Sequence, residues 1–91
     1  MENIKNKIDD LMRQEKYDDA LASINAYLAE NKNSDEAWFL AGNVHRKMEN
    51  WQGAMNAYIK AMDINPDSPA KAAYGMIVKI LDFYDKNRYN Q

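Results

Sequence analysis

A repeat with a period of 34 residues is the feature of this 91-residue sequence that most restricts its fold. When the sequence is shifted by 34 positions, small residues meet small ones and large apolar or aromatic residues meet their like. The matched pairs are Glu15 with Glu49, Tyr17 with Trp51, Ala20 with Ala54, Leu21 with Met55, Ile24 with Tyr58, Leu28 with Met62 and Ser34 with Ser68. Apolar residues within each copy recur at i, i+3, i+4, i+7 and i+8, the spacing of one helix face. Each copy is therefore predicted to form a helical hairpin.

Five helices are predicted, over residues 2–14, 17–30, 35–48, 51–64 and 69–85. Ser34 and Ser68 are suited to accept amide hydrogen bonds at the starts of the third and fifth helices. Asn65 and Pro66 end the fourth helix, because Pro has no amide donor and disfavours helical geometry in the residue before it. With only three Gly and two Pro in the chain, long helices are expected and the fold class is all-α.

The charge and composition exclude several classes of function. The net charge is −2 and no segment concentrates Lys and Arg, so no nucleic-acid partner is expected. No apolar run approaches the ~20 residues of a membrane span, and the mixed-charge start is unlike a targeting signal, so no membrane association is expected. The chain has no Cys, which is compatible with a reducing interior, and a cytoplasmic location is the expectation.

The second copy, residues 35–68, carries a recognisable series of residues. These are Trp38, Ala41, Gly42, His45, Ala54, Tyr58, Ala61 and Pro66. In type and spacing the series resembles the tetratricopeptide motif, although Ala41 is smaller than the usual Leu and His45 replaces an aromatic. Gly42 is expected to lack bulk where helices approach most closely, while Trp38 and Tyr58 fill the space beside it.

The resemblance implies a single domain, residues 1–91, built as a right-handed array of two helical hairpins and a C-terminal capping helix. Residues 1–34 would be a degenerate repeat, residues 35–68 the well-matched repeat and residues 69–91 the capping helix and a short tail. The chain is similar to small stand-alone tetratricopeptide proteins of bacteria. The implied function is that of a non-enzymatic module or scaffold that binds a protein or peptide segment on its concave face.

No catalytic, metal-binding or cofactor-binding site is predicted. His45 is the only His and has no partner at the spacing of a metal ligand or a catalytic base, so a packing role is expected. The acidic pairs Asp9-Asp10 and Asp18-Asp19 are sequence neighbours, whose side chains point about 100° apart on a helix. The chain is therefore predicted not to be an enzyme and to need no cofactor.

A candidate partner-binding face follows from the resemblance, because in this family the first helix of each repeat lines the inner face. The candidate residues are Lys5, Phe39, Asn43, Arg46, Tyr74 and Ile77. Phe39, Asn43 and Arg46 are spaced i, i+4 and i+7 and so share one face of the third helix. An extended or helical segment is predicted to dock between the third and fifth helices. The alternative is that Phe39 and Tyr74 only pack neighbouring helices.

The fifth predicted helix carries apolar residues on more than one side, whereas a terminal cap is expected to be polar outside. They are Ala73, Met76, Ile77, Ile80, Leu81, Phe83 and Tyr84. Three explanations are open: the tail containing Tyr89 folds back, a second copy packs here, or a partner covers the helix. A self-associating structural module that dimerises through this helix is the alternative function.

One partner class is predicted to be absent. Part of the family binds the carboxyl-terminal tails of heat-shock chaperones through a clamp of two Lys, two Asn and one Arg. The corresponding residues here are Lys5, Asp9, Leu40, Ala70 and Tyr74, and only Lys5 matches. Because the cationic fork is missing, no binding of chaperone tails is expected.

Overall fold

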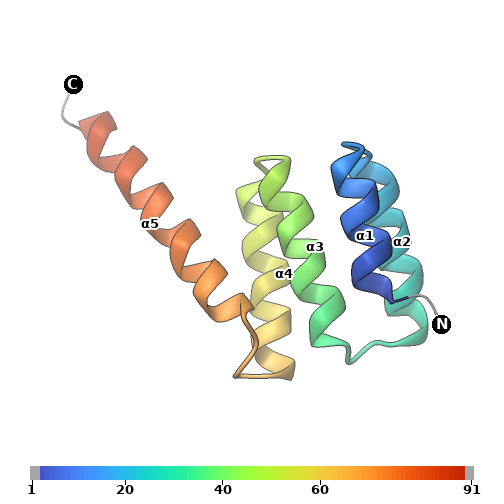
Figure 1. Ribbon diagram of the computed structural model, residues 1–91. Helices are drawn as coiled ribbons and strands as arrows, with labels where there is room; N and C mark the ends of the chain where they lie inside the picture. The colour runs from blue at the N-terminus through green and yellow to red at the C-terminus, as the bar shows by residue number, and fades with distance from the viewer. Residues whose placement is uncertain (1–2, 90–91) are drawn as a thin grey trace.

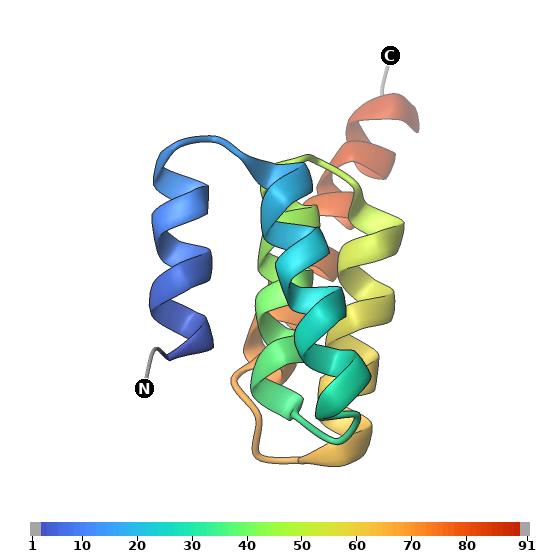
Figure 2. The ribbon, with the colours of Figure 1, turned by 90° about the vertical axis from the view of Figure 1, so that its right-hand side faces the viewer.

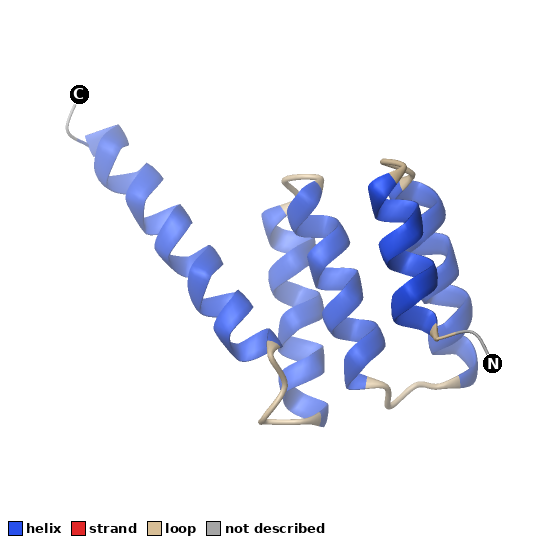
Figure 3. Cartoon of the chain, viewed as in Figure 1, coloured by secondary structure: helices blue, strands red, loops and turns tan. Residues whose placement is uncertain are grey.

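The computed structural model describes residues 3–89, which form five α-helices joined by short loops (Figures 1 and 3). The helices are α1 (Ile4–Arg13), α2 (Tyr17–Glu30), α3 (Asp35–Lys47), α4 (Trp51–Ile64) and α5 (Ala70–Tyr89). The predicted all-α class is confirmed, and α2 and α4 have the predicted bounds. α1 begins later than predicted, because the Asn3 side chain accepts the amide of Lys5 at 2.9 Å and caps the helix there.

The helices are arranged as two hairpins placed side by side, followed by one long helix. α1 and α3 form one layer, and α2 and α4 form a second layer behind it (Figures 1 and 2). α3 and α4 make the most extensive contact of any helix pair, and α5 packs chiefly on α4. The far half of α5 leans away from the hairpins, so the two ends of the chain lie at opposite sides of the molecule (Figure 1).

The loops inside the two hairpins have the same backbone geometry. Glu15 and Glu49, which are 34 residues apart, both adopt left-handed conformations, with φ of 58° and 61°. The amide after each glutamate donates to the carbonyl five residues earlier, at 2.9 Å in the first hairpin and 2.8 Å in the second. This hydrogen bond closes the last turn of a helix in a Schellman motif, where Gly is usual. The sequence repeat is thus also a repeat of backbone conformation.

The predicted serine caps are confirmed. The hydroxyl oxygen of Ser34 accepts the amide of Ala37 at 3.1 Å, and that of Ser68 accepts the amide of Ala70 at 3.1 Å. Each cap satisfies an amide that has no partner within its helix. The caps fix where α3 and α5 begin.

Two clusters of buried residues form the core. The first lies chiefly among α1, α2 and α3 and contains Ile8, Ala20, Ile24, Leu28, Ala37, Leu40, Ala41, Val44 and Ala57. The second joins α4 and α5 and contains Ala54, Tyr58, Ala61, Ala70 and Ile77. Trp38 packs against both clusters, as expected of a residue that fills space between helices. The two hairpins and α5 therefore share one continuous apolar interior.

Gly42 lies where α3 meets α4, and its lack of a side chain is required there. A Cβ atom on Gly42 would lie 2.3 Å from Cε1 of Tyr58, well inside van der Waals contact. The Tyr58 ring is fully buried against this backbone. The expectation that Gly42 marks a close helix approach is confirmed.

α5 covers the side of α4 with one stripe of residues and leaves others in solvent. Ala70 and Ile77 are fully buried, whereas Met76, Phe83 and Tyr84 are 56%, 60% and 58% exposed. The helix continues to Tyr89, beyond the predicted end at residue 85, so the backbone through Tyr89 does not fold back on α5. The end of the predicted tail, residues 90–91, lies outside the described residues.

Candidate partner-binding site

Two adjoining grooves open on the layer formed by α1 and α3. We name the first the basic groove; it has a volume of about 370 Å³ and is lined by Ile8, Asp9, Met12, Arg13, Leu40, Asn43, Val44, Arg46 and Lys47. We name the second the acidic groove; it has a volume of about 300 Å³ and is lined by Lys5, Asp35, Glu36, Phe39, Leu40, Ser68 and Pro69. Leu40 lines both, so the two grooves follow one another along α3.

The basic groove has an apolar floor because α1 and α3 each present two apolar residues four positions apart. Ile8 and Met12 come from α1, and Leu40 and Val44 come from α3. Met12 is the partly exposed member, and the other three are buried. Such a floor can take up an apolar side chain of a partner and shield it from water.

The rim of the basic groove is cationic because both inner-layer helices end there. Arg13 lies in the last turn of α1, and Arg46 and Lys47 lie in the last turn of α3. Cations are favourable at these positions, since the carbonyl end of a helix carries partial negative charge. With Asp9 as the only lining carboxylate, the groove has a formal charge of +2, although the chain as a whole carries −2.

Two ion pairs lie within α1. The Lys5 ammonium lies 2.8 Å from a carboxylate oxygen of Asp9, and Arg13 pairs with Asp10. Lys5 lines the acidic groove and Asp9 lines the basic groove, so their bridge stands where the grooves meet. Arg46 and Lys47 take part in neither ion pair, which leaves their charges available to a ligand.

The acidic groove has the opposite charge. Asp35 and Glu36 are the first two residues of α3, where a carboxylate is favourable beside the free amides. The side-chain NH₂ of Asn65 donates to a carboxylate oxygen of Asp35 at 3.0 Å and holds that carboxylate in place. Phe39, Leu40 and Pro69 supply the apolar part of the lining.

Asn43 connects the basic groove to the core. Its side-chain oxygen accepts the Tyr58 hydroxyl at 2.6 Å. Burial raises the pKa of Tyr58, and the nearby Arg46 charge lowers that pKa to a smaller extent. Because Tyr58 occupies the oxygen of Asn43, the side-chain NH₂ is the group left to meet a partner. Asn43 therefore belongs both to the groove lining and to the core contact between α3 and α4.

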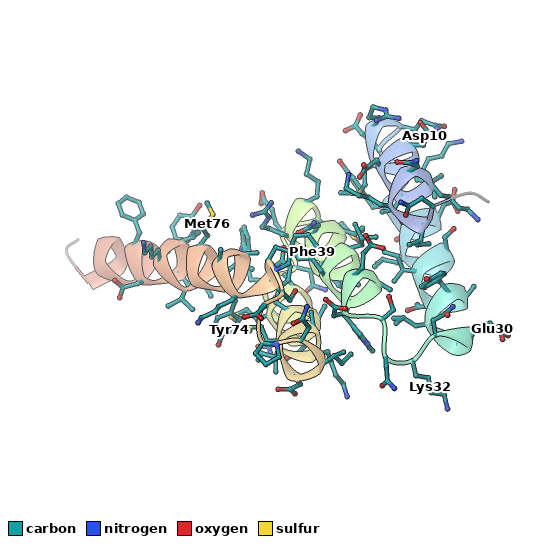
Figure 4. All side chains as sticks on the ribbon, turned by 60° about the horizontal axis from the view of Figure 1, so that its bottom comes forward. Asp10, Glu30, Lys32, Phe39, Tyr74 and Met76 are labelled. Carbon is teal, nitrogen blue, oxygen red and sulfur yellow. The ribbon has the colours of Figure 1, made fainter. Side chains whose placement is uncertain are left out.

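The structure brings four of the six predicted site residues to the grooves. Lys5 and Phe39 line the acidic groove, and Asn43 and Arg46 line the basic groove. Phe39 is also partly buried, with its ring centroid 5.9 Å from that of Tyr58. Figure 4 shows Phe39 on α3 close to the beginning of α5.

The other two predicted residues lie in the second core cluster. Ile77 is fully buried and Tyr74 packs partly buried beside it, and neither lines either groove. The prediction that Ile77 forms a wall facing a partner is wrong, because this side of α5 turns toward α4.

The groove residues that the sequence reasoning missed include Met12, Arg13 and Lys47 in the basic groove and Asp35 and Glu36 in the acidic groove. A signal for the first three existed. The 34-residue shift places Arg13 opposite Lys47 and Met12 opposite Arg46, each pair at the end of an inner-layer helix. Cations repeated at the ends of neighbouring helices mark a charged rim.

His45 lies between helices, as expected for a packing role. Its Nδ1 is 3.1 Å from the side-chain nitrogen of Asn50, so it accepts a hydrogen bond from that amide. In the described part of the chain, no three His, Asp or Glu side chains are grouped closely enough to hold a metal ion. No helix between residues 3 and 89 combines the length and apolar character needed to cross a membrane.

Comparison with known proteins gives two findings. A family model described as tetratricopeptide repeat matches residues 6–69. The solution NMR structure of the Bacteroides fragilis protein BF1650 is 41% identical in sequence and superimposes with a TM-score of 0.86, covering 100% of this chain and 92% of that one. None of the curated proteins matches the sequence.

Proposed function

The chain belongs to the tetratricopeptide repeat family, and we propose that it is a non-enzymatic module that holds a segment of another protein along α3. Repeats of this family generally mediate protein–protein interaction. The observation that carries the proposal is the pair of adjoining grooves on the layer of α1 and α3, joined at Leu40 and lined by α1, α3 and the residues Ser68 and Pro69 that precede α5.

The composition of the basic groove supports a peptide or protein ligand. An apolar floor surrounded by charged and amide groups is the arrangement in which one anchor side chain loses water while the rim fixes its orientation. Arg46 and Asn43 offer hydrogen-bond donors at the rim, and an extended backbone presents carbonyl acceptors. Met12 adds a flexible apolar side chain that adapts to different anchors.

Site-directed photocrosslinking in the native cell tests the proposal. A photoreactive residue at position 36 or 47, on the rims of the two grooves, should capture the same partner, whereas one at Gln52 on the outer helix α4 should not. With the captured partner purified, Arg46→Ala should weaken binding by ~1–3 kcal/mol. Lys71→Ala, a change of an exposed cation on α5 outside both grooves, is the matched control. Equal capture from position 52 would place the binding surface elsewhere.

Chaperone tails remain outside the proposed partners. Two of the five clamp positions, Leu40 and Ala70, are buried, and Lys5 is bonded to Asp9. A terminal carboxylate would meet no cationic fork there. Calorimetry with a chaperone tail peptide should show no binding, and a micromolar Kd would contradict this expectation.

Self-association through α5 is a second candidate function, favoured by the exposure of Met76, Phe83 and Tyr84. Large apolar side chains grouped on one helix are a common basis of dimers. Sedimentation equilibrium should then give twice the chain mass, and Phe83→Lys should return the monomer. A monomer at all concentrations up to about 1 mM would exclude this candidate.

A further inference from the structure

We propose that the partner segment is charge-segregated, with acidic residues at one end, basic residues at the other and an apolar anchor between them. This inference rests on the proposed function, since it specifies the ligand of the same two grooves. The acidic end of the segment lies over the basic groove, and the basic end lies over the acidic groove.

The first step is the separation of charge along the two grooves. The Lys5–Asp9 bridge neutralises the region where the grooves meet. Beyond it, the acidic groove keeps the carboxylates of Asp35 and Glu36, and the basic groove keeps the cations Arg46 and Lys47. The inner face is therefore negative at one end, neutral in the middle and positive at the other end.

The second step is the distance between the charged ends. Asp35 and Glu36 begin α3, and Arg46 and Lys47 end it. Eleven positions of helix separate each residue from its counterpart, which corresponds to about 16 Å at 1.5 Å per residue. An extended partner covers this distance with about five residues. A short linear segment is thus long enough to reach both ends.

The third step is discrimination between ligands. A uniformly acidic segment is attracted to the basic groove and repelled by Asp35 and Glu36. A uniformly basic segment is attracted to the acidic groove and repelled by the cations of the basic groove. A segment with separated charges is attracted at both ends in one orientation only. Phe39 and Leu40 provide the apolar contacts between the ends. Arg13 adds a third cation to the basic groove from α1.

Selection from a phage-displayed library of random dodecapeptides on the immobilised full chain tests the proposal. The enriched peptides should carry acidic residues toward one end and basic residues toward the other, with a large apolar residue between. A spin label on the acidic end of a synthetic copy should broaden the amide signals of Arg46 and Lys47 much more strongly than those of Asp35 and Glu36, and a label on the basic end should give the reverse.

The matched variants have the same change in net charge. Arg46→Gln with Lys47→Gln should weaken the selected peptide at least tenfold at low salt, and added salt should reduce this difference. Lys7→Gln with Lys71→Gln removes two exposed lysines outside both grooves and should change binding less than twofold. Circular dichroism melting of both variants checks that the fold is retained.

The outcomes separate this inference from the proposed function. Peptides that broaden groove signals but have no separation of charge overturn the inference and leave the proposed function standing. Peptides that bind only outside the grooves, or a selection without enrichment, overturn both.

Discussion

The two hairpins fill the same place in their cores with different pairs of residues. In the second hairpin Gly42 faces the fully buried ring of Tyr58, and in the first hairpin the equivalent positions hold Ile8 and Ile24, both buried. One pair combines no side chain with a large one, and the other combines two of middle size. Both pairs are buried. The two positions of the repeat must therefore fill the space between the helices together, and neither position requires one particular residue.

The difference between the two core pairs also affects how closely the helices approach and which groups reach the surface. Gly42 lets α3 approach α4 closely, whereas α1 stands farther from its neighbours (Figure 2). Tyr58 also has a hydroxyl, which holds Asn43 at the rim of the basic groove. The repeat equivalent of Asn43 is Asp9, which binds Lys5 instead. The difference in the cores is therefore transmitted to the inner face.

The largest expected effect is that of filling Gly42. Gly42→Ala should lower the free energy of unfolding by ~2–4 kcal/mol, because the new methyl group overlaps the buried Tyr58 ring. Urea unfolding at equilibrium measures it. Gly75→Ala in α5 is the control, since no atom lies within 4 Å of its added Cβ, and it should stabilise by about 0.5–1 kcal/mol. Equal effects of the two changes would show that close packing at Gly42 is not required.

Transferring the aromatic residue to the first hairpin tests whether the pairs are coupled. Ile24→Tyr should destabilise by ~1–3 kcal/mol, because Ile8 occupies the space that Gly42 leaves open in the second hairpin. Adding Ile8→Gly should recover part of this loss, so the double variant should be more stable than the sum of the single changes predicts. A double-mutant cycle in urea measures the coupling, and strict additivity would contradict it.

The Tyr58 hydroxyl has no counterpart at Ile24, and its contribution is expected to depend on pH. Tyr58→Phe should cost about 1 kcal/mol at neutral pH through the lost hydrogen bond to Asn43. The pKa of Tyr58 is raised above 10.0 in the folded protein. The unfolded chain then loses the phenol proton first, so this stabilisation is complete below about pH 10 and is lost as pH rises through the folded-state pKa.

Urea titrations between pH 7 and pH 11 check this dependence. The difference in unfolding free energy between the wild type and Tyr58→Phe should be constant to about pH 9 and shrink above about pH 10. Parallel curves for the wild type and Tyr58→Phe would contradict the expectation.

The smallest expected effect concerns a feature that the hairpins share. Glu15→Gly and Glu49→Gly should each stabilise by about 0.5–1 kcal/mol, because both residues have positive φ, which Gly adopts without strain. The two gains should be equal, since the loops have the same hydrogen bonds. Lys60→Gly inside α4 should instead cost about 1 kcal/mol. Unequal gains in thermal melts would show that the loops differ in strain.

Much of the fold was predictable because the period of 34 residues fixes the positions of the helices along the chain. The caps at Ser34 and Ser68 and the close approach at Gly42 were read from residue type and spacing, and the structure confirms them. Local hydrogen bonding and side-chain size determine these features. For that reason a single sequence was sufficient to predict the caps and the close helix approach.

The orientation of α5 was not predictable in the same way. The helix carries two apolar stripes with helical spacing: one contains residues 70, 74, 77 and 81, and the other contains residues 73, 76, 80 and 83. Either stripe could face α4, and the spacing does not choose between them. The structure buries Ala70 and Ile77 and leaves Met76 and Phe83 exposed, which removed Ile77 from the candidate site.

The basic groove needed knowledge of which ends of α1 and α3 lie side by side. Arg13 and Lys47 are 34 residues apart, and only the stacking of two hairpins brings both to one groove. Asn43 was correctly placed on the inner layer, but its bond to Tyr58 depends on the inclination of a ring from a different helix. Contacts between helices, more than the helices themselves, were the unpredictable part.

Because α5 is long, its far end lies well away from the buried residues that hold it against α4. Its twenty residues extend about 30 Å at 1.5 Å per residue, and its buried anchors Ala70 and Ile77 lie in the first half. A rotation of about 10° at its start would move the far end by about 5 Å over that length. Ser68 and Pro69 directly precede α5 and also line the acidic groove. Because α5 is one continuous helix, a ligand that displaced Ser68 and Pro69 would also displace the exposed residues Met76 and Phe83.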